Sequence, residues 1–315
     1  MTVVADPAQG DPAKLSGVHR VVFLGDSITH SGQYIDFFET VLRLHQPQIR
    51  CDFLNLGLPS ETVSGLSEPG HAGGKFPRPD LHERLDRVLA QTKPDLVIAC
   101  YGMNCGIYHP FSDLRFAQYQ AGLEYLYVRA TMAGAALVLI TPPTFDPMPI
   151  RAKTLPAGLD EYRSPYEGYN DVLDRYAQWL LDQRQRGWDV VDAHGPMNTY
   201  LAKARERDPS LVLARDGVHI DATGHWLIAK QLLLYFDIDS DEVARADSID
   251  RILHSAPHGN DVLTLVRERN RLLRDAWVSA TGHKRPGMKQ GLALDEALAK
   301  AKEIDTDLRK LTGSM

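Results

Sequence analysis

The stretch of sequence that decides the fold is VVFLGDSI, which runs from Val21 to Ile28. Its first four residues are apolar and begin with two β-branched valines, a pattern typical of a buried strand. Gly25 then permits a sharp turn, which leaves Ser27 at the carboxyl end of the predicted strand. In an open parallel sheet, ligands bind at that edge. We therefore expect Ser27 to lie at a functional site, where its hydroxyl needs a neighbouring base to react.

A candidate base lies much further along the chain, in the segment Asp216-Gly217-Val218-His219. Asp216 precedes His219 by three residues in a turn-forming Asp-Gly segment. One ring nitrogen can then donate to the carboxylate while the other nitrogen faces a serine. We predict that Ser27 is a nucleophile, that His219 is its general base, and that Asp216 orients the base.

Two further loops at predicted strand ends carry donors for a developing oxyanion. Gly57 follows the second predicted strand and has no Cβ to block approach to its N–H. Asn104 follows the third predicted strand and carries a side-chain amide. Together with the N–H of Ser27, these two groups are the predicted oxyanion hole.

Four segments of the chain resemble, in the same order, the four blocks of the SGNH hydrolase (GDSL esterase/lipase) family: Gly25–Ile28, Gly57, Gly102–Asn104 and Asp216–His219. The resemblance covers residues 18–237. It implies a flavodoxin-like three-layer α/β/α sandwich and ester hydrolysis through an acyl-enzyme, with no metal and no cofactor. It also implies the roles given above for Ser27, Gly57, Asn104, Asp216 and His219. One departure is Cys105, which stands where the family often has an aspartate that supports the loop.

Strand-like and helix-like segments alternate along the chain, which predicts a parallel five-stranded sheet with helices on both faces. The expected strands are His19–Leu24, Ile49–Leu56, Leu96–Tyr101, Ala135–Thr141 and Trp188–Asp192, and the expected helices are Gln33–His45, Leu81–Gln91, Phe111–Ala133, Tyr166–Arg186 and Thr223–Tyr235. The Pro-rich stretch 142–165 is expected to be an irregular loop at the active edge. We assign 1–17 to a flexible N-terminal segment, 18–245 to the hydrolase domain and 246–315 to a helical C-terminal extension.

The extension is expected to form two helices, Asp261–Ala280 and Leu294–Leu311, joined by a segment with Gly and Pro. From Arg267 to Lys289 the chain has seven Lys or Arg side chains against two acidic ones. Three interpretations stay open: helices that pack on the main domain, an arm that forms a homo-oligomer, and a surface or lid for an acidic polymer.

Composition narrows the class of protein. The 315 residues are 43% hydrophobic and 24% charged, as in ordinary soluble proteins. The formal net charge of −6 argues against a nucleic-acid partner. The longest apolar runs, Leu96–Cys100 and Ala135–Ile140, are too short to cross a membrane. The first residues show no signal peptide, so the location stays open: secreted or periplasmic if a signal was removed, and cytoplasmic otherwise.

Neither disulfides nor a metal site is expected. Three cysteines cannot all pair with one another, and Cys51 and Cys100 lie in strand-like apolar segments where buried free thiols are expected. Four histidines that are separated by loops lack the compact spacing of metal ligands: His30, His71, His82 and His109.

Five residues beside the predicted blocks are candidate substrate contacts: Asp26, His30, Tyr101, Tyr108 and His109. Asp26 is expected mainly to stabilise the turn at the end of the strand. The rings of Tyr101, Tyr108 and Phe145 lie on loops at the active edge, where they can stack on a sugar face. His225 is expected to cap or pack the following helix rather than to act as the base.

The leading functional hypothesis is a carboxylic ester hydrolase that removes short acyl groups, acetyl above all, from a carbohydrate. A lipase, lysophospholipase or thioesterase would use the same residues on longer acyl chains. An O-acyltransferase would pass the acyl group to a sugar hydroxyl. A fourth hypothesis is a non-catalytic carbohydrate-binding module.

Overall fold

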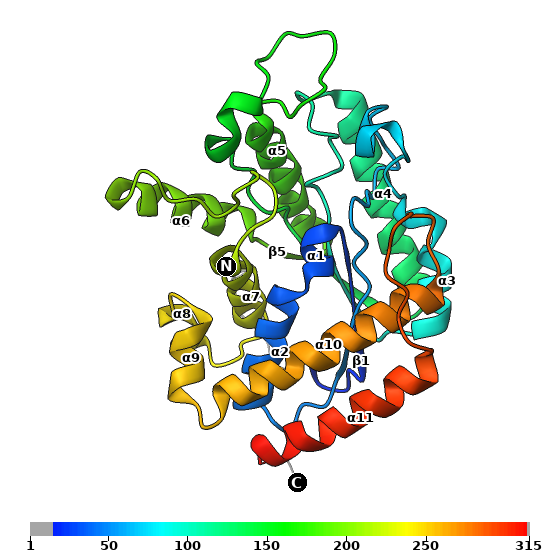
Figure 1. The fold of residues 1–315 in the computed structure, drawn as a ribbon, viewed down its shortest axis with the longest axis vertical. Coiled ribbons are helices and arrows are strands. Elements are labelled where there is room, and N and C mark those ends of the chain that lie inside the picture. Colours follow the sequence, from blue (N-terminus) through cyan, green and yellow to red (C-terminus); the bar gives the residue numbers. More distant parts are fainter. Residues whose placement is uncertain (1–14, 314–315) are drawn as a thin grey trace, which may run out of the picture.

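The computed structural model describes residues 15–313, which form an α/β fold around one five-stranded sheet (Figure 1). All neighbouring strands are parallel, and their order is β2-β1-β3-β4-β5. The strands are β1 (Arg20–Gly25), β2 (Asp52–Asn55), β3 (Leu96–Cys100), β4 (Ala136–Ile140) and β5 (Asp189–Val191). The predicted parallel sheet is therefore confirmed. Most of the predicted N-terminal segment 1–17 lies outside the described residues.

Helices cover both faces of the sheet, as the three-layer prediction requires. Helices α2 (Gln33–His45) and α7 (Ala222–Tyr235) lie side by side on one face. Helices α3 (Leu85–Thr92), α4 (Asp113–Met132) and α5 (Tyr169–Asp182) connect the later strands across the other face. Helices lie on both faces because each crossover between parallel strands is right-handed. The step from β1 to β2 runs in one direction along the sheet and the later steps run in the opposite direction, so their helices lie on opposite faces.

Short helical turns fill the connections: α1 (Ser27–Ser31) and the 3-10 helices η2 (His71–Gly74), η3 (Leu81–Glu83), η4 (Met148–Lys153) and η5 (Gln183–Arg186). The helix predicted at Leu81–Gln91 is wrong at its start, where η3 ends before α3 begins. The predicted irregular loop 142–165 contains η4 but otherwise has no helix or strand.

The sequence analysis assigned no element to helix α6 (His194–Arg207). The helix has a Gly-Pro pair at positions 195–196, in its first turn. Proline is tolerated in the first turn of a helix, because the N–H groups of that turn have no partner inside the helix. In the part of the chain that the structure describes, no helix is both long and apolar enough to span a membrane.

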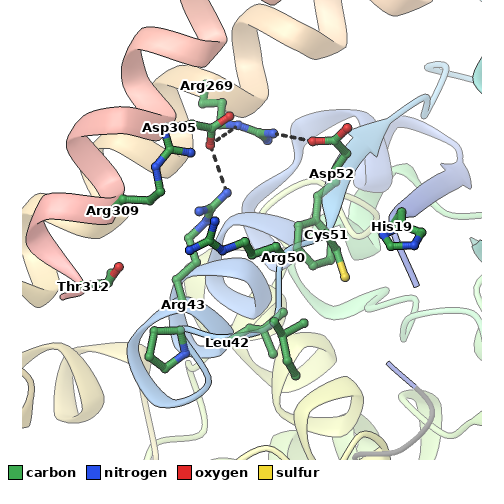
Figure 2. A pocket seen from close by; sticks show the side chains of 13 residues that line it. His19, Leu42, Arg43, Arg50, Cys51, Asp52, Arg269, Asp305, Arg309 and Thr312 are labelled. Atoms are coloured by element: carbon green, nitrogen blue, oxygen red, sulfur yellow. Dashed lines mark hydrogen bonds and ion pairs between the residues drawn. The ribbon is translucent and has the colours of Figure 1, made fainter. Parts of the chain in front are cut away.

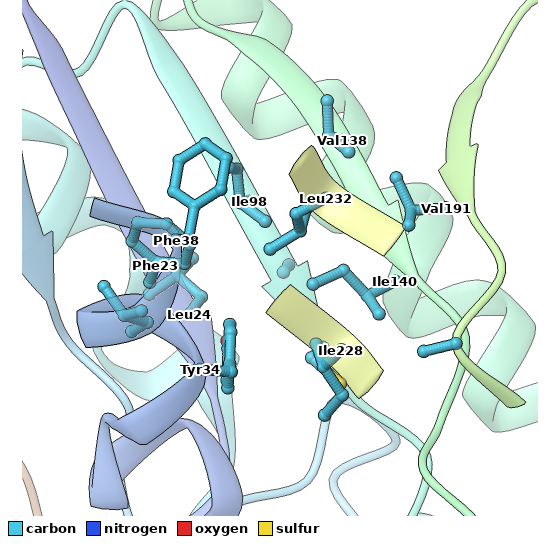
Figure 3. Packing of buried hydrophobic residues seen from close by; sticks show 14 of the residues in the cluster. Phe23, Leu24, Tyr34, Phe38, Ile98, Val138, Ile140, Val191, Ile228 and Leu232 are labelled. Carbon is cyan, nitrogen blue, oxygen red and sulfur yellow. The ribbon is translucent and has the colours of Figure 1, made fainter. Parts of the chain in front are cut away.

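The core lies on both faces of the sheet, and its part between the sheet and the pair α2–α7 is drawn in Figure 3. Phe23 of β1 is completely buried, and its ring centroid lies 6.0 Å from that of Tyr34 and 6.5 Å from that of Phe38. Ile228 and Leu232 of α7 lie over the strands beside these rings. The alternation read from the sequence thus corresponds to one continuous apolar core.

The C-terminal region forms four helices rather than two: α8 (Ser240–Arg245), α9 (Ile249–Ser255), α10 (Gly259–Thr281) and α11 (Leu294–Leu311). The first two are too short to give a clear periodic pattern. Helix α10 packs across α2 and β2, and α11 packs on α10 (Figure 1). The extension therefore packs on the main domain, and a homo-oligomer through these helices stays a prediction.

Buried charges fasten this extension to the domain (Figure 2). Arg269 of α10 is 2% exposed and lies 2.8 Å from Asp305 of α11 and 3.4 Å from Asp52 of β2. The adjacent Asn270 donates to Asp36 at 3.0 Å and to the fully buried Glu39 at 2.9 Å, both on α2. These charged and polar groups are costly to bury, but with partners on both sides they fix α10 in one position.

The ionic contacts border a cavity of about 300 Å³ between α2, β2 and the two last helices. Its walls include the arginines Arg43, Arg50, Arg269 and Arg309. His19 and Asp52 place it at the amino ends of β1 and β2, opposite the edge where Ser27 lies.

Replacing Phe23 by Ala tests the core. We expect Phe23→Ala to lower the free energy of unfolding by about 3–5 kcal/mol, because it removes a fully buried ring from three aromatic neighbours. Leu114→Ala on α4, where the side chain is 72% exposed, is the control and should change the value by less than about 0.5 kcal/mol. Urea unfolding measures both, and equal effects would contradict the packing described here.

Asp36 gives the docked extension a pH dependence. Burial is the main cause that raises the pKa of Asp36 from 3.8 to about 7. Between these values the folded protein keeps a proton that the unfolded chain loses, so this group's contribution to stability falls as pH rises. The fall is at most about 1.4 kcal/mol per pH unit. Asp36→Asn should therefore gain stability relative to wild type from pH 4.5 to 7 in urea unfolding. Asp307→Asn, an exposed change on α11, should not, and parallel curves for wild type and Asp36→Asn would refute the assignment.

Candidate active site

Ser27 is the first residue of α1, one residue after the end of β1. Asp26 caps this helix, because its Oδ1 accepts from the N–H of Ile28 at 2.9 Å. Gly25 is required for space rather than for a turn: a Cβ there would lie 2.1 Å from Oγ1 of Thr29. The strand thus runs straight into a short helix that lies against its own end.

Ser27, His219 and Asp216 form one chain of hydrogen bonds. His219 Nε2 lies 2.8 Å from Ser27 Oγ, and His219 Nδ1 lies 2.6 Å from Asp216 Oδ2. The other carboxylate oxygen of Asp216 accepts from the N–H of His219 at 2.8 Å. Partial burial acts to raise the pKa of Asp216, but the hydrogen bonds from the His219 ring and from backbone N–H groups outweigh it. The pKa therefore lies below its ordinary value, and the carboxylate stays charged beside the imidazole.

The loop that carries His219 is held from behind by residues that the sequence analysis missed. The carbonyl of Gly217 accepts from the N–H of Asp146 at 2.9 Å. Asp146 is buried and accepts from Arg205 of α6 at 2.6 Å, and Arg205 also donates to the carbonyl of Leu211. The ion pair between Asp146 and Arg205 thus connects three segments: the loop after β4, helix α6, and the loop between α6 and α7 that carries His219.

The prediction that Gly57 offers a free N–H is wrong. This N–H donates to Oδ1 of Asn55 at 2.9 Å. A Cβ at Gly57 would lie 2.4 Å from the backbone nitrogen of His30. Gly57 is therefore glycine because α1 approaches so closely, and its amide is already used.

The following turn offers a different donor. The N–H of Leu58 donates to Gly25, that of Glu61 to Leu58, and that of Thr62 to Pro79. Among the residues that the structure describes, no hydrogen-bond partner is found for the N–H of Ser60. Ser60 has a left-handed φ of 69° and is only partly buried. The loop after β2 therefore leaves the Ser60 amide available, and the Pro-Ser pair at 59–60 was its only signal in the sequence.

Asn104 lies at the same edge in a network of its own. Its Nδ2 donates to Asp26 Oδ2 and to the carbonyl of Glu61, both at 3.3 Å, and its Oδ1 accepts from the hydroxyl of Tyr108 at 2.9 Å. Burial raises the pKa of Asp26 from 3.8 to about 6. The prediction that Asp26 stabilises the turn agrees with its cap, whereas its burial at 3% exposure argues against a contact with substrate.

A buried glutamate supports this loop, which lacks the aspartate common after the asparagine. Glu61 is fully buried and accepts from Arg84 Nε at 2.6 Å and from the Tyr101 hydroxyl at 2.6 Å. Arg84 also donates to the carbonyl of Leu56 at 2.6 Å. The prediction that Tyr101 stacks on a sugar is therefore wrong, because its ring is 2% exposed and its hydroxyl joins the loops after β2 and β3.

Of the other aromatic residues predicted to contact substrate, two line a cavity and one does not. Tyr108 and His109 line a cavity of about 790 Å³, together with Arg78 and Tyr162. Phe145 is 1% exposed and does not reach that cavity.

Two histidines near the site have structural contacts. His30 Nδ1 lies 2.9 Å from the carbonyl of Gly57, and burial followed by the charge of Arg274 lowers the pKa of His30 to about 4. His225 is buried, stacks on Tyr34 and lies 3.1 Å from Ser31 Oγ, as expected of a packing residue.

The structure agrees with the predictions on cysteines. Cys51, Cys100 and Cys105 are all buried free thiols. Within residues 15–313, the four histidines considered above form no metal-like group, and the one His/acid group with suitable spacing is His45, Asp239 and Glu242, at the end of α2 and the start of α8.

Comparison with known proteins identifies the family. The GDSL-like lipase/acylhydrolase family matches residues 23–227. No curated protein matches the chain. Among solved structures, a gut microbial diltiazem-metabolizing enzyme is 21% identical, with a TM-score of 0.52 over 73% of this chain and 47% of the other. This chain thus spans about half the length of that protein.

A second similar structure is a catalytic mutant of Axe2, an acetylxylan esterase from Geobacillus stearothermophilus. It is 20% identical, with a TM-score of 0.51 over 73% of this chain and 96% of the other. Another variant of the same esterase gives a TM-score of 0.52 at 20% identity, over 73% of this chain and 97% of the other. At such identities the solved structures show the fold, and the family match adds the class of chemistry. This chain belongs to the GDSL-like lipase/acylhydrolase family.

Proposed function

We propose that this protein removes short acyl groups, acetyl above all, from a carbohydrate, with Ser27 as the nucleophile. The observation that carries the proposal is the unbroken chain of hydrogen bonds from Ser27 through His219 to Asp216. Such a chain is what serine catalysis of acyl transfer requires.

His219 Nε2 would take the proton from Ser27 Oγ as this oxygen attacks the ester carbonyl. Asp216 would hold the ring in the required tautomer and stabilise its charged form. The protonated ring would then give its proton to the leaving alcohol, which leaves an acyl group on Ser27. A water molecule, activated by the same ring, would release the acid and restore the serine.

Three donors would stabilise the oxyanion: the N–H of Ser27, the N–H of Ser60 and Nδ2 of Asn104. The two hydrogen bonds of Nδ2 are long at 3.3 Å each, so this amide can turn towards a developing charge at low cost. One such donor contributes about 100- to 1,000-fold to kcat.

The carbohydrate part of the proposal is supported by the 790 Å³ cavity that is lined by Tyr108, whose hydroxyl donates to Asn104. Tyr108 and His109 line it with rings, and Arg78 and Glu68 provide charged groups. Aromatic faces mixed with polar groups suit a sugar better than an acyl chain, and the acetylxylan esterase among the similar structures acts on a substrate of this class.

Ser27→Ala tests the nucleophile. We expect it to lower kcat more than about 1,000-fold on p-nitrophenyl acetate and to abolish labelling by a fluorophosphonate. Ser31→Ala is the control: this serine lies on the same short helix, but its hydroxyl contacts Ile28 and His225. If wild type is not labelled, the non-catalytic hypothesis is favoured.

Rates on a panel of esters test the length of the acyl group and the class of the alcohol part. Acetate release from acetylated oligosaccharides, with rates that decline beyond four carbons on p-nitrophenyl esters, is the expected result. A rate maximum at eight carbons or more would favour the lipase or thioesterase hypothesis. Transfer of acetyl to an added sugar faster than hydrolysis would favour the acyltransferase.

Tyr108→Phe tests the position of Asn104. The change removes the hydroxyl that fixes Oδ1 of Asn104, so we expect kcat on p-nitrophenyl acetate to fall about two- to tenfold. Tyr162→Phe removes a hydroxyl from the same cavity, where it binds the carbonyl of Pro156, and is the matched control. If both variants lose the same activity, the effect belongs to the cavity and not to Asn104.

A further inference from the structure

The connection between α10 and α11 reaches the catalytic loops. Arg274 of α10 donates to the carbonyl of His30, at the end of α1, at 2.9 Å. Beyond α10, Arg285 donates through Nε to the carbonyl of Pro59 at 2.8 Å. The extension therefore contacts both the helix that carries Ser27 and the turn that carries the Ser60 amide.

Arg285 is itself held in place. Its guanidinium carbon lies 5.5 Å from the centre of the Phe76 ring, and its Nη1 donates to the carbonyl of Pro286 at 3.1 Å. The start of the connection is anchored as well, because Arg87 of α3 donates to the carbonyl of Thr281 at 3.0 Å. A planar guanidinium with several contacts loses little further freedom when it binds a carbonyl.

The contact with Pro59 bears on Ser60 because both belong to one peptide unit. The unit is planar and trans, so its C=O and its N–H point in opposite directions. Residues 58–61 form a turn closed by the hydrogen bond from the Glu61 N–H to the Leu58 carbonyl at 3.1 Å. With a proline second and a φ of 69° at the third residue, Ser60, the turn has the pattern of type II.

Serine is a poor residue for that position. Type II turns favour glycine there, whereas a type I turn gives the third residue a negative φ and reverses the central peptide. Reversal would relieve the backbone strain at Ser60, which costs on the order of 1–3 kcal/mol. It would also turn the Ser60 N–H to the opposite side. The hydrogen bond from Arg285 to the Pro59 carbonyl opposes this reversal.

We propose that Arg285 of the C-terminal extension is a positioning residue for the oxyanion hole, which keeps the Pro59–Ser60 peptide turned so that the Ser60 N–H faces the reacting ester. The proposal rests on the proposed function, in which this N–H is a donor. It gives the extension a role in catalysis in addition to its packing.

A double-mutant cycle tests it. Arg285→Met should lower kcat on p-nitrophenyl acetate about tenfold with KM changed less than twofold, because a misplaced donor affects the transition state more than the bound ester. In a Ser60→Gly background the same change should cost less than about threefold, since glycine adopts the left-handed conformation without help. Rates are expressed per active site titrated with a fluorophosphonate.

Lys284→Met is the matched control. It removes the same charge from the adjacent residue, whose side chain is 80% exposed and whose ammonium lies 3.8 Å from Glu83 rather than on the Pro59 carbonyl. It should leave kcat unchanged. Arg285→Lys, which keeps the charge but not the fork of donors, should lie between wild type and Arg285→Met. It also serves if the Met variant does not fold.

The outcomes separate the two proposals. If wild type hydrolyses no ester, the proposed function fails. If wild type is active but Arg285→Met behaves like Lys284→Met, the positioning role fails and the function stands. A loss at Arg285 that is as large in the Ser60→Gly background, or that appears only in KM, also overturns it, because the arginine would then act on stability or on substrate rather than on the turn.

Discussion

The close approach of helix α1 to the ends of β1 and β2 is the constraint on which the site depends. A methyl group at Gly25 or at Gly57 would collide with the atoms of this helix, at 2.1 Å and 2.4 Å. Asn55 completes the contact, because its side chain donates to the carbonyl of Thr29 at 2.7 Å and accepts from the N–H of Gly57. With α1 held there, Ser27 stands at the carboxyl edge of the sheet, where the loops after β2 and β3 and the loop of His219 also arrive. Two glycines and one asparagine thus set the position of the nucleophile.

Around this contact, buried ionic and polar groups tie loops that are distant in sequence. Glu61, held by Arg84, joins the loop after β2 to the loop after β3 through Tyr101, and Asp146 with Arg205 supports the loop of His219. Arg269 fixes α10 to the main domain at the far edge of the sheet (Figure 2). A polar group that is buried with partners specifies a geometry, because any other arrangement leaves it unpaired. The C-terminal extension makes contacts of the same kind. Its Arg285 donates to the carbonyl of Pro59, in the turn that the N–H of Glu61 closes.

Local patterns predicted much of this protein. The apolar run ending at Gly25 predicted β1, the alternation of elements predicted the sheet, and the order of four short segments predicted the family. The predicted role was wrong for residues whose role depends on contacts with residues distant in sequence. Gly57 was interpreted as an exposed amide, although its hydrogen atom in place of a side chain makes room for His30. Tyr101 was interpreted as a sugar platform, although its hydroxyl is bound to a buried glutamate. Nothing near Arg285 in the sequence indicates that its partner is Pro59.

The sequence by itself determined the five strands, most of the main-domain helices, the family and the three residues of the hydrogen-bonded chain, because these depend on periodicity and on short motifs. Only the tertiary structure decided which amides after β2 are already hydrogen-bonded, which carboxylate holds Tyr101 and what the last helices contact. Those choices depend on which groups lie within about 3 Å of one another after folding, and hydrogen bonds form or fail over such small differences in distance. Residues 60 and 285 become neighbours in function only when α10 lies across α2 and brings its following loop to the turn after β2.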